Sequence, residues 1–171
     1  MRLIGILLCL TTLLCAKIGD FKTIQSDFIQ KVTNDQNKTI AYEGTFYATK
    51  EQKALWVYQK PVVKKIYFNQ NKVLIVEPEL EQVIVTTLQN TPNIAQLLRE
   101  AKEVAPNRYI TRFMDTTYTI VGSNDTIEKI SYKDKLENNV EILFSNASTD
   151  LFIDDEMFRP DIPKGYDIVR E

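Results

Sequence analysis

Residues 39–88 read as a ladder of short β-strands, and this stretch restricts the possible folds more than any other part of the chain. Isoleucine, valine, tyrosine, phenylalanine and threonine dominate it, and these side chains suit a pleated, half-buried surface. Almost no helical periodicity interrupts them. Short polar segments typical of turns separate the expected strands, which are 39–49, 53–59, 63–68, 72–76 and 81–88.

The strand expected at 39–49 alternates between two kinds of side chain. Glu43 and Thr45 fall on one face, and the opposite face carries Ile40, Tyr42, Phe46 and Ala48. A period of two indicates a strand with one buried and one solvated side. The apolar face of a sheet has to be covered, and we expect part of that cover to be removable.

The first 16 residues have the pattern of a secretory signal. A positive start at Arg2 precedes the apolar run Leu3–Leu14, which is too short to anchor the chain stably in a bilayer. Cleavage after Ala16 would leave 17–171 as a single domain in the space between the two membranes of a bacterium. Two alternatives stay open, namely an uncleaved anchor and a lipoprotein signal with acylation at Cys15.

The charge balance bears on the class of partner. The chain has 21 basic and 23 acidic residues, so its formal net charge is −2, and it becomes −3 when Arg2 leaves with the signal. A nucleic-acid-binding domain normally shows a basic field. The composition therefore excludes nucleic acid from the expected partners.

Histidine and cysteine, which many catalytic and metal sites use, are missing from the expected mature chain. The chain contains no histidine, and Cys9 and Cys15 both lie in the signal. The mature chain therefore has no disulfide and lacks the commonest general base and the commonest transition-metal ligands. No phosphate loop, dinucleotide fingerprint or nucleophile elbow is present.

One acidic group needs an explanation of its own, and it consists of Asp150, Asp154, Asp155 and Glu156. It lacks the ligand spacing and the glycine of a calcium loop. Acidic residues at the start of a short helix account for it, because they complement the helix dipole. The sequence therefore predicts a protein that is not an enzyme and that needs no cofactor or metal.

The start of the mature chain predicts a helix, then a strand. Ile18, Phe21 and Ile24 recur at a spacing of three, which predicts a short helix over 17–25. Residues 26–33 alternate as a strand does, and 34–38 have the composition of a turn, so a hairpin into 39–49 is expected.

A longer helix is expected after the ladder. Thr91 suits an N-cap, Pro92 suits the first helical position, and Pro106 ends the pattern. Its apolar stripe comprises Ile94, Leu97, Leu98, Ala101 and Val104. Either ordinary packing on the sheet or a movable lid explains such a stripe. Strands are then expected at 109–114, 117–121, 126–132 and 139–145, followed by one helical turn within 153–158 and a last strand at 166–169.

Four motifs follow one another along the mature chain. They are F-x-Q-x-V within 27–32, Gly44 with Leu55-Trp56 and Pro61, the segment 78–83, and a closing motif of Phe158, Pro160, Pro163 and 165–168. Together they resemble LolA, the family of periplasmic carriers of outer-membrane lipoproteins. The chain departs from that family at 50–53, where Lys-Glu-Gln-Lys replaces an arginine-proline pair whose arginine helps to hold a lid closed. It also departs at 69–71, which replaces an aspartate-glycine turn.

The resemblance implies a mainly β fold with helical cover: an open, unclosed antiparallel β-barrel of about eleven strands, with a helical lid over a hydrophobic cavity. It implies that acylated lipoproteins are received from an inner-membrane ABC transporter complex. They would be passed to an outer-membrane acceptor, LolB where one exists. It implies no cofactor, and we expect a monomer. A lipid-anchored acceptor like LolB, or an envelope binding or sensor module of the same fold, is the alternative.

On such a fold, the alternation of strand faces predicts the residues that line a lipid-binding cavity. From the strands they are Phe28, Tyr42, Phe46, Trp56, Tyr58, Ile66 and Phe68, and from the helix they are Ile94, Leu97, Leu98 and Ala101. Lys50 is the nearest counterpart of the family's latch arginine, so it is the candidate lid latch, although lysine lacks the planar fork of donors.

The segment Asp35–Thr39 matches an acceptor for N-glycosylation at Asn37, and its leading aspartate resembles the extended sequon that some bacteria use. A polar turn is the alternative explanation. Asn124 and Asn146 begin similar triplets without the acidic lead.

Overall fold

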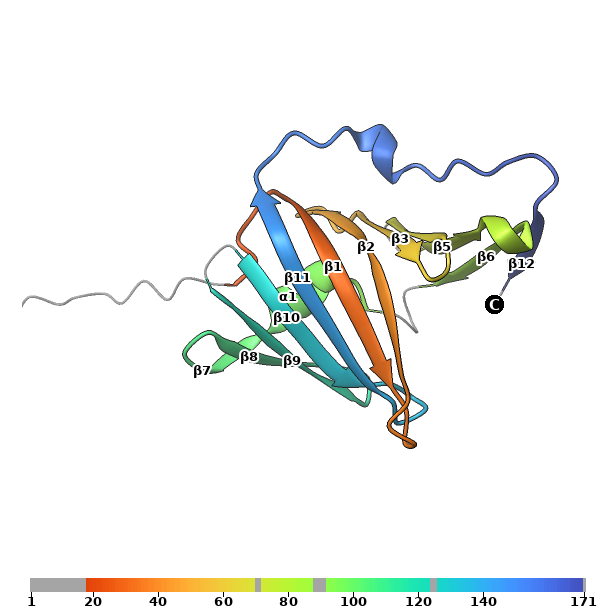
Figure 1. Cartoon of the computed structure of the whole chain (residues 1–171). Helices are drawn as coiled ribbons and strands as arrows, with labels where there is room; N and C mark the ends of the chain where they lie inside the picture. Colours follow the sequence, from red (N-terminus) through yellow and green to blue (C-terminus); the bar gives the residue numbers. More distant parts are fainter. Residues whose placement is uncertain (1–17, 70–71, 88–91, 124–125, 171) are drawn as a thin grey trace, which may run out of the picture.

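The computed structural model describes residues 18–69, 72–87, 92–123 and 126–170. Within them, twelve strands form one curved sheet (Figure 1). The strands are β1 (Thr23–Thr33), β2 (Thr39–Thr49), β3 (Ala54–Lys60), β4 (Lys64–Asn69), β5 (Lys72–Glu77), β6 (Gln82–Thr87), β7 (Lys102–Ala105), β8 (Arg108–Phe113), β9 (Thr116–Ser123), β10 (Thr126–Lys133), β11 (Asn139–Thr149) and β12 (Asp167–Arg170). The helices are α1 (Ile94–Glu100) and two 3₁₀ turns, η1 (Pro78–Leu80) and η2 (Asp155–Phe158).

The strand order is β12-β6-β5-β4-β3-β2-β1-β11-β10-β9-β8-β7. The first strand pairs with β2 on one side and with β11 on the other, both antiparallel, so the two halves of the chain meet in the middle of the sheet. The order ends at β12 and β7, so the described strands form an open sheet rather than a closed barrel. This confirms the predicted mainly β, unclosed antiparallel architecture, with α1 lying against its concave side (Figure 1).

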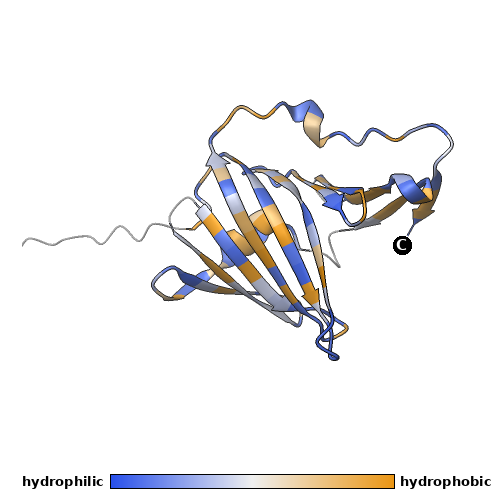
Figure 2. Cartoon of the chain, in the orientation of Figure 1, coloured by the Kyte–Doolittle hydropathy of each residue, from blue (hydrophilic) through white to orange (hydrophobic). Residues whose placement is uncertain are grey.

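Each face of the sheet has its own cover. Leu55 and Trp56 are neighbours on β3 and are both buried, but they belong to separate hydrophobic clusters because successive side chains point to opposite faces. The cluster around Trp56 includes the buried side chains of α1, and the cluster around Leu55 includes Phe158 of η2. Figure 2 shows the resulting alternation of hydrophobic and hydrophilic residues along β1, β10 and β11.

The prediction of a helix over 17–25 is wrong. Ile18 and Gly19 form a turn, Gly19 has a left-handed φ of 80°, and β1 begins at Thr23. The backbone carbonyl of Thr23 accepts a hydrogen bond from the Asp150 amide at 2.9 Å, so the backbone here serves sheet neighbours instead of a helix. The apolar spacing reflects burial of a turn and a strand start, because a period of three over so few residues does not specify a helix.

The second predicted helix exists but is shorter than expected. Its N-cap is Asn93, whose Oδ1 accepts a hydrogen bond from the Ala95 amide at 3.0 Å, so Pro92 precedes the cap instead of opening the helix. Thr91, the expected cap, lies outside the described residues. The helix ends at Glu100, and β7 pairs with β8 where the sequence suggested further helical turns. Sheet pairing outweighs helix propensity here. Strand β7 was not predicted, and it is the reason that the sheet has twelve strands instead of about eleven.

Most other elements agree with the sequence analysis. The turn at 34–38 joins β1 to β2 as a hairpin, η2 supplies the helical turn expected within 153–158, and β12 supplies the last strand. The sequence did not indicate that β12 pairs in parallel with β6. The predicted signal, its cleavage after Ala16 and the candidate lipidation at Cys15 lie outside the described residues.

Candidate ligand-binding cavity

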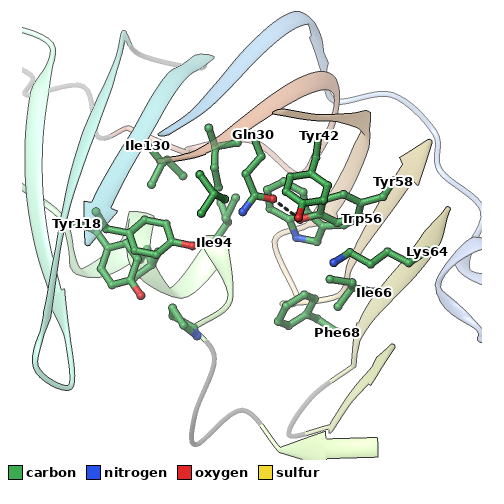
Figure 3. Close-up of a pocket in the computed structure, with 15 residues that line it drawn as sticks. Gln30, Tyr42, Trp56, Tyr58, Lys64, Ile66, Phe68, Ile94, Tyr118 and Ile130 are labelled. Atoms are coloured by element: carbon green, nitrogen blue, oxygen red, sulfur yellow. Dashed lines mark hydrogen bonds between the residues drawn. The ribbon is translucent and has the colours of Figure 1, made fainter. Parts of the chain in front are cut away.

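A cavity of about 340 Å³ lies between α1 and the concave face of the sheet (Figure 3). Both halves of the sheet contribute to its wall, because β1 and β11 join them. Its lining is largely aromatic and aliphatic, and it comprises Gln30, Val32, Tyr42, Trp56, Tyr58, Lys64, Ile66, Phe68, Pro92, Ile94, Leu97, Tyr118, Ile130, Tyr132 and Ile142. A concave, mostly apolar site with a few polar groups is typical of small-molecule binding.

The structure brings most of the residues predicted for the cavity to its wall. The predicted residues that line it are Tyr42, Trp56, Tyr58, Ile66, Phe68, Ile94 and Leu97. Four others do not. Phe28 and Phe46 are buried behind Trp56, with ring centroids 4.8 Å and 4.4 Å from its own, so they support the wall from inside the core. Ala101 is the C-cap of α1 and packs at the edge of the core.

Leu98 faces a second, smaller cavity of about 190 Å³ on the other flank of α1. This cavity lies between the helix and the first described residues, Ile18–Phe21, and it also touches Lys50 and Arg99. Leu97 and Leu98 are adjacent in the sequence, so they project about 100° apart around the helix and reach different spaces. The apolar stripe therefore predicted that both residues are buried, but it did not show that they face different cavities.

Gly44 explains how Phe28 reaches its position. A Cβ on Gly44 would lie 2.1 Å from the carbonyl oxygen of Val57 and 2.8 Å from Cε1 of Phe28. The glycine therefore lets the phenylalanine ring lie across β2, where it meets Trp56 and Tyr58 edge to face. This glycine is one of the motif residues in the sequence, and its role is to make room for the aromatic wall.

Four of the eight lining residues that the sequence analysis missed come from the second half of the sheet, on β9, β10 and β11. Tyr118 and Tyr132 lie with ring centroids 4.7 Å apart, and Ile130 and Ile142 lie beside them. Alternation in 116–123 and 126–133 would have indicated one buried face for each strand. It does not show that this face curves toward β2–β4, because that follows from the pairing of β1 with β11.

Three polar side chains gather on one side of the cavity. The Tyr58 hydroxyl donates a hydrogen bond to Oε1 of Gln30 at 2.6 Å. The Lys64 ammonium lies 4.6 Å from the ring centroid of Tyr58 and 5.6 Å from that of Tyr42. Burial raises the pKa of Tyr58 far above its usual value, and burial raises the pKa of Tyr132 to about 12. Both tyrosines therefore stay neutral hydrogen-bond donors at physiological pH.

The turn between β2 and β3 holds α1 at both ends through Gln52. The Asn93 side-chain nitrogen donates to the Gln52 carbonyl oxygen at 2.7 Å. With the Gln52 amide oxygen turned toward the guanidinium, Oε1 accepts from Nη1 and Nη2 of Arg99 at 3.0 Å and 3.1 Å. Lys50, the predicted latch, lies beside the helix and forms an exposed ion pair with Asp20 at 3.2 Å. Its latch role stays a prediction.

The acidic group near the C-terminus caps a short helix and joins segments that are distant in the sequence. Asp154 caps η2 by accepting from the Glu156 amide at 3.0 Å, and Asp150 accepts from the Lys22 amide at 2.7 Å. Asp155 pairs with Lys53 at 2.8 Å. In the described part of the chain, no group of three metal-ligating side chains forms a cation site.

Asn37 occupies the tip of the β1–β2 hairpin. It is exposed with a left-handed φ of 59°, and Asn34 closes the turn by accepting from the Gln36 and Lys38 amides. Asn146 differs, because it lies in β11 and its amide nitrogen donates to the Asp27 carboxylate of the neighbouring strand β1 at 2.9 Å. We expect N-linked modification at Asn37 and none at Asn146 in the native host, and glycopeptide mass spectrometry checks both. An unmodified Asn37 in a host that glycosylates such sequons would favour the plain polar turn.

Comparison with known proteins decides the family. The model of the family described as outer membrane lipoprotein carrier protein LolA matches residues 19–114. The outer-membrane lipoprotein carrier protein of Campylobacter jejuni is 38% identical over 151 residues, which are 88% of this chain and 88% of that protein. The chain belongs to the LolA family. The outer-membrane lipoprotein carrier protein of Wolinella succinogenes is 36% identical over 142 residues, which are 82% of this chain and 81% of that protein.

Solved structures support the LolA fold independently of sequence. A LolA superfamily protein from Nitrosomonas europaea has a TM-score of 0.55 at 9% identity and covers 84% of this chain and 93% of its own. An uncharacterized conserved protein from Thermus thermophilus has a TM-score of 0.54 at 10% identity, covering 88% and 91%. Among the described residues of this LolA family member, every helix is too short or too polar to cross a membrane.

Proposed function

We propose that this LolA family protein is a periplasmic carrier of lipoproteins. It binds the acyl chains of lipoproteins that leave the inner membrane and delivers them to the outer membrane. The observation that carries the proposal is an apolar cavity beneath a helix whose two ends are hydrogen-bonded to the β2–β3 turn, in a chain whose relatives are named outer-membrane lipoprotein carrier proteins. The protein acts as a monomer and as a carrier rather than an enzyme.

The proposal includes the processing and the partners expected from the sequence. A signal at 1–16 directs export and is removed, and 17–171 form the carrier domain. An inner-membrane ABC transporter complex supplies the cargo, and an outer-membrane acceptor, LolB or its equivalent, receives it. The carrier uses no cofactor of its own, and the burial of acyl chains from water supplies the driving force for binding.

The size of the cavity limits how much lipid the closed form holds. Its volume of about 340 Å³ is near the small end of ligand pockets, which span about 300–1,000 Å³. Each methylene buried from water contributes about 0.8 kcal/mol, so three long chains in full would exceed the practical limit of about 20 kcal/mol for non-covalent binding. Partial burial therefore keeps release possible, and a larger load requires α1 to move away from the sheet.

A release assay tests the proposed function. Purified carrier is incubated with inner-membrane vesicles that contain the transporter, ATP and a labelled lipoprotein. The carrier should bring the lipoprotein into the soluble fraction as a complex that co-purifies with it. Label that stays with the vesicles at every carrier concentration would contradict the proposal. The mature N-terminus separates carrier from acceptor, since a free Lys17 fits the former and an acylated Cys15 the latter.

We expect Gln52→Ala to loosen α1. The change removes the side-chain contact with Arg99, and a hydrogen bond to a charged group contributes about 1.5–3 kcal/mol, less where solvent reaches it. A loss of about 1–2 kcal/mol would raise the fraction of molecules with α1 detached from the sheet about 5–30-fold. Hydrogen exchange at the Leu97 and Leu98 amides measures that fraction. Arg99→Met should match Gln52→Ala, and Glu51→Ala, in the same turn, should leave exchange unchanged. Equal exchange in all three variants would show that the contact between Gln52 and Arg99 does not hold α1 against the sheet.

A further inference from the structure

Lys64 is the one charged side chain among the described residues that line the main cavity. It stands at the start of β4, directly opposite Tyr58 of β3. Figure 3 shows the side chain extending along the cavity wall toward Tyr42 and Tyr58. A lysine in this position is unusual for a site that only has to hold hydrocarbon, because a charge that leaves water needs a compensating partner.

Within the described part of the chain, Lys64 makes no salt bridge. Its ammonium lies over the faces of Tyr58 and Tyr42, and such contacts orient a cation without using its three N–H donors. Partial burial lowers the pKa of Lys64 from its ordinary value, and the Glu77 carboxylate opposes that shift without reaching salt-bridge distance. By contrast, Lys60 nearby is exposed and pairs with Glu43 at 3.5 Å.

A second donor lies on the same side of the cavity. The Oε1 atom of Gln30 is engaged by the Tyr58 hydroxyl, and its amide nitrogen has no hydrogen bond within the described residues. The ammonium of Lys64 and the amide of Gln30 therefore offer N–H donors beside the hydrocarbon wall of Trp56, Phe68 and Leu97. The Lys64 ammonium supplies a positive charge that suits an anion with two or more oxygens, and the Gln30 amide is a further donor in the same cavity.

We propose that this cavity binds a single-chain amphiphile with an anionic head group, with the head at Lys64 and Gln30 and the chain along the apolar wall. The part of this proposal that concerns the acyl chain rests on the proposed function. The part that concerns the anionic head group goes beyond it, because the acyl groups of a lipoprotein are attached through ester and amide links, which carry no charge. The carboxylate of a free fatty acid and the phosphate of a lysophospholipid share the chemistry that the site recognises.

Binding of matched oleoyl compounds to the full mature protein tests the proposal. Calorimetry below the micellar concentration compares oleate, lysophosphatidate with an oleoyl chain, and neutral oleoyl glycerol. A charge-assisted hydrogen bond should make one or both anions bind about tenfold or more tightly than the neutral compound. Stronger binding of oleate identifies a carboxylate ligand, and stronger binding of lysophosphatidate identifies a phosphate ligand.

Substitutions connect that preference to Lys64. Lys64→Met should abolish the preference for the anions over oleoyl glycerol, Lys64→Arg should retain it, and Lys60→Met is the surface control. Equal affinity of the unmodified protein for all three compounds, or an unchanged preference in Lys64→Met, would overturn the head-group site and leave the carrier function standing. Binding of none of the compounds would overturn both.

Discussion

Leu97→Glu is expected to reduce lipoprotein release from inner-membrane vesicles by more than about 100-fold. Leu97 is 3% exposed and lines the cavity from α1. A carboxylate there would have to lose its hydration whenever the helix closed over an acyl chain, at a cost of several kcal/mol. The closed, loaded form should therefore disappear while the sheet stays folded. The vesicle assay measures release, and circular dichroism checks the fold.

Gln96→Glu is the matched control, because it places the same side chain one residue earlier on the same helix. Gln96 is half-buried, donates to Glu100 at 3.2 Å and lines neither cavity. Its variant should release lipoprotein nearly as well as the unmodified protein. Normal release by a folded Leu97→Glu variant would show that the cavity beneath α1 does not hold the cargo.

Phe158→Ala is expected to cost about 3–5 kcal/mol of unfolding free energy, the typical range for a buried phenylalanine. Phe158 is fully buried against the face of the sheet opposite α1, among Leu55, Tyr67, Val76 and Val83. Loss of the ring would leave a void under the segment 150–166, which joins β11 to β12 and is called the strap below. Urea unfolding measures the change as a shift in midpoint.

Met157→Ala provides the comparison on that strap, because Met157 is 40% exposed and its loss should change stability by about 0.5 kcal/mol or less. Similar midpoints for the two variants would mean that Phe158 does not hold the strap. Since the two clusters lie on opposite faces, the Phe158 variant should still bind acyl chains under conditions where it remains folded.

The strands were predictable because their signal is local. Alternation and turn composition predicted β2 to β6. Five polar residues predicted the hairpin turn at 34–38, in which the Asn34 side chain accepts a hydrogen bond from the Lys38 amide. The failures occurred where distant pairing decides the outcome. Residues 102–105 have helical neighbours in the sequence, yet they pair with β8, and the start of β1 is fixed by strands more than 20 residues away.

The candidate site was predictable to the same extent. Alternation assigned Tyr42 and Phe46 to one face, and they do share it. Alternation does not show how far each side chain lies from the cavity. Phe46 lies in the core behind Trp56, whereas Tyr42 reaches the cavity. Lys64 was overlooked because a lysine at a strand end normally faces solvent. Alternation would nevertheless have placed it on the cavity face, because Lys64, Ile66 and Phe68 are two residues apart on β4 and all three line the cavity.

Photo-crosslinking from β4 tests the central claim most directly. Ile66 lines the cavity, and Lys65, its neighbour, is exposed on the opposite side of the strand. A photoreactive phenylalanine at either position is exposed to light in the presence of lipoprotein labelled in its acyl chains. The account predicts labelled carrier with the probe at position 66 and little or none at 65. Equal labelling at the two positions, or labelling at 65 alone, would contradict it.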